Sequence, residues 1–210
     1  ERVARLLDRG VALANSLASV NERGIRVTTP YDDHYPERLK DRLGTQAPMC
    51  LYYAGNVELL AQDGFGVVGS RNLDENAVVA AQSVARMVGK SGEILVSGGA
   101  RGVDSISMSE AYDSGGSVVG VIAGSLEKVA GVAQHREGMV EGVACFCTPY
   151  NPDSPFTVGN AMGRNKIIYG LSKVTLVVTS DEGKGGTWEG AIEAMNKNYG
   201  QVAIWLGGGP

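Results

Sequence analysis

From residue 64 onward, short apolar runs alternate with longer segments whose apolar residues recur at helical spacing. Successive Val, Ile and Leu positions are typical of parallel strands buried on both faces. The runs predict strands at 65–70, 93–97, 117–123, 144–149, 173–180 and 201–206. Helices are expected at 75–89, where Asp74 is the N-cap, and at 102–113, 134–142, 160–170 and 187–197. This alternation predicts an α/β fold with a Rossmann-like, open, mostly parallel sheet and helices on both faces.

The first sixty residues follow a less regular pattern. Apolar residues near helical spacing predict a helix over 1–20, and Pro36 opens a second, short helix in "YPERLKDRL". The segments "GIRVTTP" and "CLYYAGN" are expected to be strands. We interpret 1–60 as a small N-terminal module packed on a main domain at 61–210.

Composition and charge exclude several classes of protein. The net charge of −4 means that any contact with nucleic-acid phosphates must come from a local basic patch. No apolar run is long enough to cross a bilayer, and the charged start does not resemble a secretory signal. Cys50, Cys145 and Cys147 lack metal-ligand spacing, so we expect no metal or cofactor and a reducing, cytoplasmic location.

Three glycine-bearing loops follow predicted strands: "GSR" at 69–71, "SGGARGVD" at 97–104 and "DEGKGGTWEG" at 181–190. The carboxyl ends of parallel strands form the ligand-binding edge of such sheets, and the last two loops also open helices. Helix-start amides suit an anion, and Arg101 or Lys184 could complete the charge match. The candidate phosphate-binding residues here are Gly69, Ser70, Arg71, Ser97, Gly98, Gly99, Arg101, Gly102, Lys184, Gly185, Gly186 and Thr187.

Two common nucleotide motifs do not fit these loops. The 97–104 loop lacks the first glycine of the dinucleotide fingerprint, and no acidic residue ends the next strand to bind a ribose. No G-x-x-x-x-G-K-[ST] sequence occurs, which excludes a Walker A loop. The loops therefore indicate a phosphate-bearing ligand without naming it.

A fourth cluster lies in "FTVGNAMGRNKIIYGLS". On a helix, Asn160 and Arg164 lie one turn apart on one face, and Asn165 and Lys166 flank Arg164. An Arg–Asn pair can bind a phosphate and a base edge together. We add these four residues to the candidate site.

The segments "VVGSR", "VSGGARGVD", "GRNKIIYGLS" and "GKGGTWEGA", in this order and preceded by "YPERLKDRLGTQAPMCLYYAGN", resemble the DNA-processing protein A (DprA/Smf) family. The resemblance covers about residues 30–206 and implies an extended Rossmann-like domain, in a superfamily shared with the lonely-guy phosphoribohydrolases. It implies a homodimer that binds single-stranded DNA without sequence preference and passes it to a RecA-type recombinase in transformation or repair. By motif position the implied contacts are Ser70, Arg71, Gly98 to Gly102, Arg164, Asn165, Lys166 and Gly185 to Thr187.

This sequence departs from the family pattern at several positions. Ser107 and Met108 stand where the family usually has Ala-His, and "GGTWEGA" replaces "GSLxTA". These departures are typical of a divergent branch, which could serve repair or phage defence rather than transformation.

Two other functions stay open beside single-stranded DNA binding. One is a nucleotide-sensing domain that uses the same loops. The other is a nucleotide N-glycosidase, but Glu189 lies one position early relative to the phosphoribohydrolase motif, which turns its carboxylate by about 100° on a helix. No other catalytic set is present, and we assign no catalytic residues.

Overall fold

The structure is a computed structural model that describes residues 8–207. Within them an eight-stranded sheet has the order β1-β2-β6-β5-β4-β3-β7-β8. The strands are β1 (Arg26–Thr28), β2 (Leu51–Gly55), β3 (Gly64–Val68), β4 (Ile94–Ser97), β5 (Ser117–Val121), β6 (Ala144–Thr148), β7 (Ser172–Val177) and β8 (Gln201–Ile204). The strands β3 to β8 are parallel, as predicted, while β1 and β2 are antiparallel.

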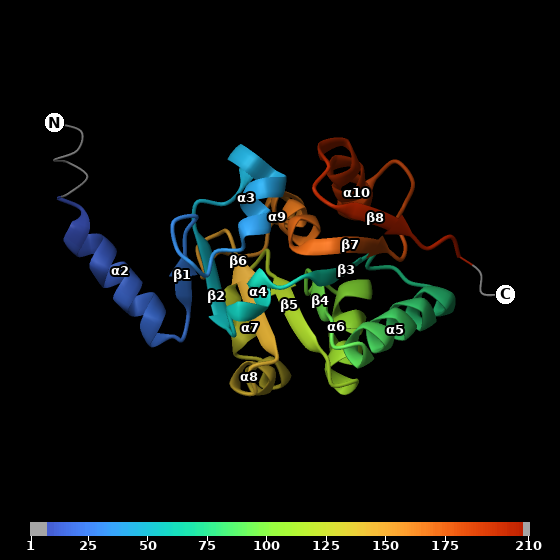
Figure 1. Ribbon diagram of the computed structural model, residues 1–210, viewed down its shortest axis with the longest axis horizontal. Helices are drawn as coiled ribbons and strands as arrows, with labels where there is room; N and C mark the ends of the chain where they lie inside the picture. The colour runs from blue at the N-terminus through green and yellow to red at the C-terminus, as the bar shows by residue number, and fades with distance from the viewer. Residues whose placement is uncertain (1–7, 208–210) are drawn as a thin grey trace.

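Helices cover both faces of the sheet (Figure 1). One face carries α3 (Glu37–Leu43), α4 (Glu58–Ala61), α9 (Val158–Leu171) and α10 (Gly185–Lys197). The other carries α5 (Glu75–Lys90), α6 (Val103–Asp113), α7 (Leu126–Ala130) and α8 (Ala133–Val140). Each layer buries its own apolar cluster against the sheet, which confirms the predicted Rossmann-like architecture.

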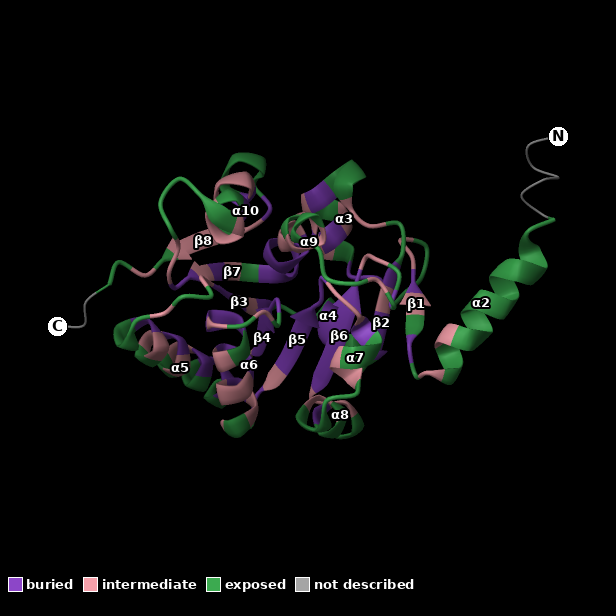
Figure 2. Cartoon of the chain, turned by 180° about the vertical axis from the view of Figure 1, so that it is seen from behind, coloured by how far each residue is buried: buried purple, intermediate pink, exposed green. Residues whose placement is uncertain are grey.

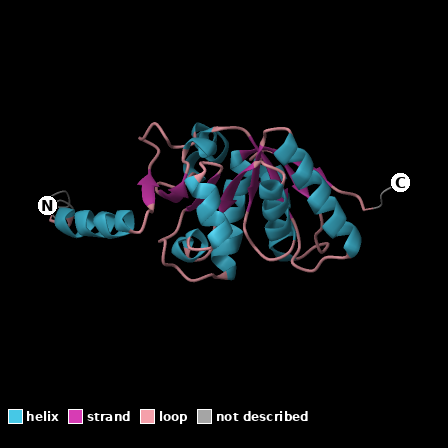
Figure 3. Cartoon of the chain, turned by 90° about the horizontal axis from the view of Figure 1, so that it is seen from below, coloured by secondary structure: helices cyan, strands magenta, loops and turns pink. Residues whose placement is uncertain are grey.

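The helix α5 shows how the sequence pattern produces this packing. Asp74 caps it as predicted, since its carboxylate accepts a hydrogen bond from the amide of Ala77 at 2.7 Å. Ala77, Ala81 and Ala85 form a buried stripe of small side chains. This stripe lets α5 pack closely on the sheet beside α6 (Figure 3).

The N-terminal strands join the main sheet. The strand β2 pairs antiparallel with β6, and β1 pairs with β2, so residues 26–55 extend one edge of the eight-stranded sheet. The helix α2 (Gly10–Glu22) projects away from this edge and buries none of its residues (Figure 2). Residues 1–7 of the predicted first helix lie outside the described residues. The division of the chain at residue 60 stays a prediction.

Several short elements differ from the sequence expectations. The helices α4 and α7 and the 3-10 turn at Gly44–Gln46 were not predicted, because segments of three to five residues carry too little periodicity. The helix α8 begins and ends slightly earlier than 134–142, and α9 begins two residues before the predicted start at 160.

The topology creates a crevice between β3 and β7. From β3 the chain continues through α5 on one face, while from β7 it continues through α10 on the opposite face. The two connections diverge and leave a gap at the carboxyl ends of these neighbouring strands. Ligands of open α/β sheets bind at such switch points.

Candidate phosphate-binding site

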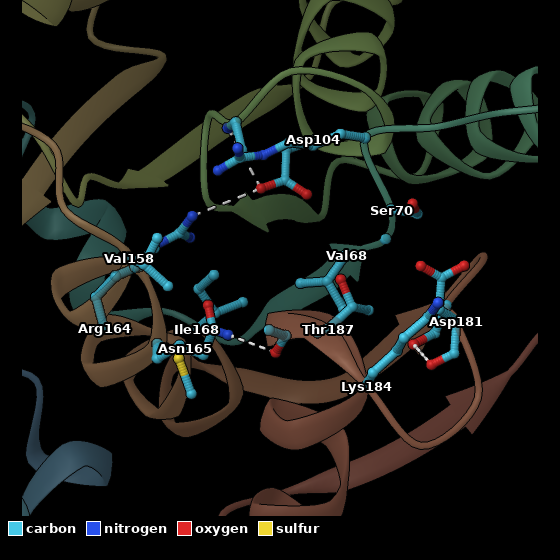
Figure 4. Close-up of a pocket in the computed structure, with 18 of the residues that line it drawn as sticks. Val68, Ser70, Asp104, Val158, Arg164, Asn165, Ile168, Asp181, Lys184 and Thr187 are labelled. Carbon is cyan, nitrogen blue, oxygen red and sulfur yellow. Dashed lines mark hydrogen bonds and ion pairs between the residues drawn. The ribbon is translucent and has the colours of Figure 1, made fainter.

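A cavity of about 320 Å³ opens at this switch point, and we call it the β3–β7 pocket (Figure 4). Its walls come from the loop after β3, the loop after β7, and the helices α9 and α10. It is lined by Val68, Gly69, Ser70, Arg71, Ala100, Asp104, Phe156, Val158, Ala161, Met162, Arg164, Asn165, Ile168, Tyr169, Ser180, Asp181, Lys184, Gly185, Gly186 and Thr187.

The helix α9 is fixed at both of its ends. Thr157 caps its start, where its hydroxyl accepts a hydrogen bond from the amide of Asn160 at 3.0 Å. At the other end, Arg42 of α3 donates to the carbonyl of Gly170 at 3.2 Å, and Arg38 donates to that of Leu171 at 3.0 Å. These arginines satisfy carbonyls that lack helical partners. The helix therefore holds its pocket-facing residues in a fixed position.

Arg164 is the central cation of the pocket. It is only 4% exposed, and its Nη2 lies 3.8 Å from Oδ2 of the buried Asp104. Its Nε and Nη1 have no hydrogen-bond partner. A Cβ at position 98 would lie 1.6 Å from Arg164 Nη1, so Gly98 is needed for the close approach of the guanidinium. Burial lowers the pKa of Arg164, although Asp104 opposes this effect.

Asp104 lies in the second position of α6 and turns back into the loop that precedes it. Its Oδ2 accepts from the amide of Ala100 at 3.4 Å, and the amides of Gly98 and Gly69 also favour its charged form. Burial nevertheless raises the pKa of Asp104 above its ordinary value. The amides predicted to cradle a phosphate in the 97–104 loop thus already surround a carboxylate of the protein.

The start of α10 has no such internal anion. Its N-cap residue, Lys184, makes no side-chain capping bond, and Gly185 adopts a φ of 86°. Asn165 donates from Nδ2 to the carbonyl of Gly186 at 2.9 Å and so links α9 to this loop. Gly185, Gly186 and Thr187, the first three residues of α10, line the pocket. This helix start is suited to an anion.

Arg71 and Phe156 form one rim of the pocket. The guanidinium carbon of Arg71 lies 5.2 Å from the centre of the Phe156 ring, within cation–π range. Arg71 is exposed and Phe156 is 49% exposed. The rim therefore presents a cation and an aromatic face to solvent.

Other predicted site residues lie outside the lining of this pocket. Ser97 is buried and donates to the carbonyl of Val67 at 2.7 Å, and Lys166 reaches Gln46 at 3.4 Å. Gly102, with a φ of 93°, allows the start of α6 to pack against Ser70. The remaining ones are Gly98, which supports Arg164, and Gly99, Arg101 and Asn160.

The motif search missed the acidic residues of the pocket, Asp104 and Asp181. Asp104 ends the quoted "VSGGARGVD", and a carboxylate in the first turn of a helix is the available signal, because it can bond back to loop amides. The aromatic residues Phe156 and Tyr169 line the pocket. Trp188 and the carboxylate residue Glu189 line a separate depression on α10.

Within the described part of the chain, the cysteines and acidic residues form no cluster that could hold a metal ion. Cys145 and Cys147 are buried in β6, and burial raises the pKa of Cys147 to about 12. Among residues 8–207, no three His, Cys, Asp or Glu side chains gather where they could bind a metal ion. No helix in that same range is long and apolar enough to span a membrane.

Comparison with known proteins identifies the family of the chain. Residues 26–206 match the model of the family described as DNA recombination-mediator protein A. The chain belongs to the DNA recombination-mediator protein A family. The match includes β1 and β2 as well as every strand of the parallel sheet.

Curated relatives are similar over most of the chain. The DNA processing protein DprA of Bacillus subtilis (strain 168) is 26% identical over 196 residues, which is 91% of this chain and 64% of that protein. The DNA processing protein DprA of Streptococcus pneumoniae is 30% identical over 167 residues, covering 77% of this chain and 57% of that protein. The chain thus spans less than two thirds of the length of either relative.

Solved structures show the same fold. DNA processing protein A from Streptococcus pneumoniae superposes with a TM-score of 0.74 at 25% identity, covering 91% of this chain and 67% of that one. DNA processing protein A from Helicobacter pylori, described for its single-stranded DNA binding mode, gives a TM-score of 0.67 at 22% identity. The latter covers 86% of this chain and 80% of that one.

Proposed function

We propose that this chain binds single-stranded DNA and holds its backbone phosphate in the β3–β7 pocket. The observation that carries the proposal is Arg164, which is buried at the pocket wall with Nε and Nη1 unpaired. A buried cation with free donors is stabilised by an incoming anion. Membership of a DNA-processing family supports DNA as the source of that anion.

The surrounding charges favour a phosphate at this position. Arg71 and Lys184 flank the mouth, and the first amides of α10 face the same cavity. Such a local patch is what a chain of net charge −4 needs for nucleic-acid binding. Asp104 and Asp181 lie in the same pocket and limit its net positive charge.

The rim supports a single strand over a duplex. Phe156 offers a half-exposed ring beside Arg71, and an unpaired base can stack on such a surface. Stacking tolerates every base, so binding is expected to be independent of sequence. A duplex keeps its bases stacked on one another and gains less from this ring.

The test is a fluorescence-anisotropy titration with a labelled oligo-dT, its duplex and thymidine monophosphate at low and near-physiological salt. We expect single-strand binding that weakens with salt and falls about tenfold in Arg71→Ala. Arg136→Ala is the matched control, because Arg136 is exposed on α8 and lies outside the pocket. Stabilisation by the mononucleotide without oligonucleotide binding would contradict the proposal and favour nucleotide sensing.

We further propose, from the family resemblance, that the chain acts as a homodimer that delivers the strand to a RecA-type recombinase in the cytoplasm. We propose transformation, repair or phage defence as the process that this delivery serves. Light scattering tests the dimer, and a monomer at micromolar concentration would contradict it. Recombinase filament formation on protected single strands, with and without this protein, tests the delivery step.

A further inference from the structure

The 97–104 loop and Arg164 together surround one anion already, the carboxylate of Asp104. Oδ2 of Asp104 lies 3.4 Å from the amide of Ala100 and 3.8 Å from Nη2 of Arg164. Both side chains are buried, at 5% and 4% exposure. Backbone amides and a guanidinium are the same donors that bind a phosphate oxygen.

The pair is incomplete as an ion pair. The separation of 3.8 Å exceeds hydrogen-bonding distance, and Arg164 keeps Nε and Nη1 without partners. Figure 4 shows Arg164 reaching from α9 towards Asp104 across the top of the pocket. Asp104 therefore offsets part of the charge of Arg164 without a hydrogen bond to Nε or Nη1.

We infer that Asp104 is a built-in counter-anion that weakens and thereby sets the affinity of the β3–β7 pocket for phosphate. The inference rests on the proposed function, since it assigns a role to Asp104 in that same site. A negative carboxylate beside Arg164 repels an incoming phosphate and competes for the same guanidinium. A protein that must release its strand to another protein gains from such a limit on affinity.

A purely structural role for Asp104 makes the opposite prediction. If Asp104 only positions Arg164, then Asp104→Asn loosens the guanidinium and weakens binding. If Asp104 is a counter-anion, the same variant keeps an amide-accepting oxygen, removes the negative charge and tightens binding. Asparagine is also expected to be tolerated, because it has nearly the same shape as aspartate and its oxygen can still accept from the amide of Ala100.

The experiment is a double-mutant cycle on the full chain, with labelled oligo-dT as the probe. Asp104→Asn is expected to bind about tenfold tighter than the wild type. In the Arg164→Met background the same change should alter affinity by less than about twofold, because its effect acts through Arg164. Equal or weaker binding by Asp104→Asn would overturn the inference.

A second readout separates this inference from the proposed function. Inorganic phosphate should raise the melting temperature of Asp104→Asn more than that of the wild type. If neither protein binds oligo-dT but phosphate prefers the variant, the DNA function fails and the counter-anion role stands. If phosphate shows no preference, the counter-anion role fails. Should the variant unfold without ligand, recovery of folding by phosphate supports the role, and its absence overturns it.

Discussion

The 97–104 loop and the 181–190 loop differ in what their helix-start amides contact. Both follow parallel strands, both are rich in glycine, and both carry one cation. In the first loop, the carboxylate of Asp104 accepts a hydrogen bond from the amide of Ala100. In the second, no side chain caps the helix, and Lys184, Gly185 and Gly186 line the β3–β7 pocket.

The difference shows that glycines and a cation do not by themselves make a phosphate site. A carboxylate in the first turn of the following helix decides whether the amides are free. The first loop contributes to the pocket mainly through Gly98, which leaves room for the guanidinium of Arg164. The second loop lines the β3–β7 pocket directly. Three comparisons between variants test this division.

The largest effect is expected from Gly98→Ala. The added Cβ would lie 1.6 Å from Arg164 Nη1, so the guanidinium must move away from its present position. We expect the free energy of unfolding to fall by about 1–3 kcal/mol and oligo-dT affinity to fall about tenfold. Urea unfolding and anisotropy measure the two effects.

Gly159→Ala, on α9, is the matched control. A Cβ there meets no atom closer than 4.0 Å, and both quantities should stay near their wild-type values. A Gly98→Ala protein with wild-type affinity would show that the position of Arg164 is irrelevant to binding.

The next effect compares the cations of the two loops. Lys184 lines the pocket, whereas Arg101 is exposed beyond its lining. Lys184→Ala should weaken oligo-dT binding about fivefold and reduce the slope of log K against log salt by about one. Arg101→Ala should have a smaller effect on both.

Lys90→Ala serves as the control, because Lys90 ends α5 and does not line the β3–β7 pocket. An Arg101→Ala defect larger than that of Lys184→Ala would reverse the comparison of the two loops and restore the first as the direct phosphate contact.

The smallest effect concerns pH. Burial raises the pKa of Asp104 in the folded protein above its unfolded value of about 4. The folded state therefore binds a proton that the unfolded chain releases. The stability that this group contributes is fully present below the unfolded pKa and is lost as pH rises through the folded pKa.

The free energy of unfolding of the wild type, minus that of Asp104→Asn, should thus decrease as the pH rises above about 4. Urea unfolding of both proteins across this range measures the difference. An increase with pH would mean that attraction to Arg164 outweighs burial at Asp104.

The sequence predicts the parallel sheet well because its evidence is local. Each of β3 to β8 is a run of apolar residues that needs no partner to be recognised, and Asp74 caps α5 within three residues of its own position. The pairing of β2 with β6 is different, since it joins Tyr53 to Cys147 across the chain. No local pattern encodes that contact.

For the candidate site, the sequence predicts which loops lie close together but not how their side chains point. Motif order located Arg71, Arg164 and Gly185 near one sheet edge, because the carboxyl ends of parallel strands share an edge. The orientation of each side chain depends on packing between distant segments. Lys166 follows Arg164 by two residues, yet it reaches Gln46 instead of the pocket.

The contacts of Arg38 and Arg42 with the end of α9 have a consequence for folding order. They join residues more than 120 positions apart in the chain. Contacts between residues so far apart are expected to form late in folding. The chain must first lose the entropy of closing a long loop, and only then does the contact stabilise it. The strands β3, β4, β5 and β6 can pair through nearer contacts, whereas β7 pairs with β3 across more than 100 positions of the chain. The β3–β7 pocket depends on the fixed position of α9 and on the pairing of β3 with β7. It is therefore expected to form after the strands β3 to β6 have paired.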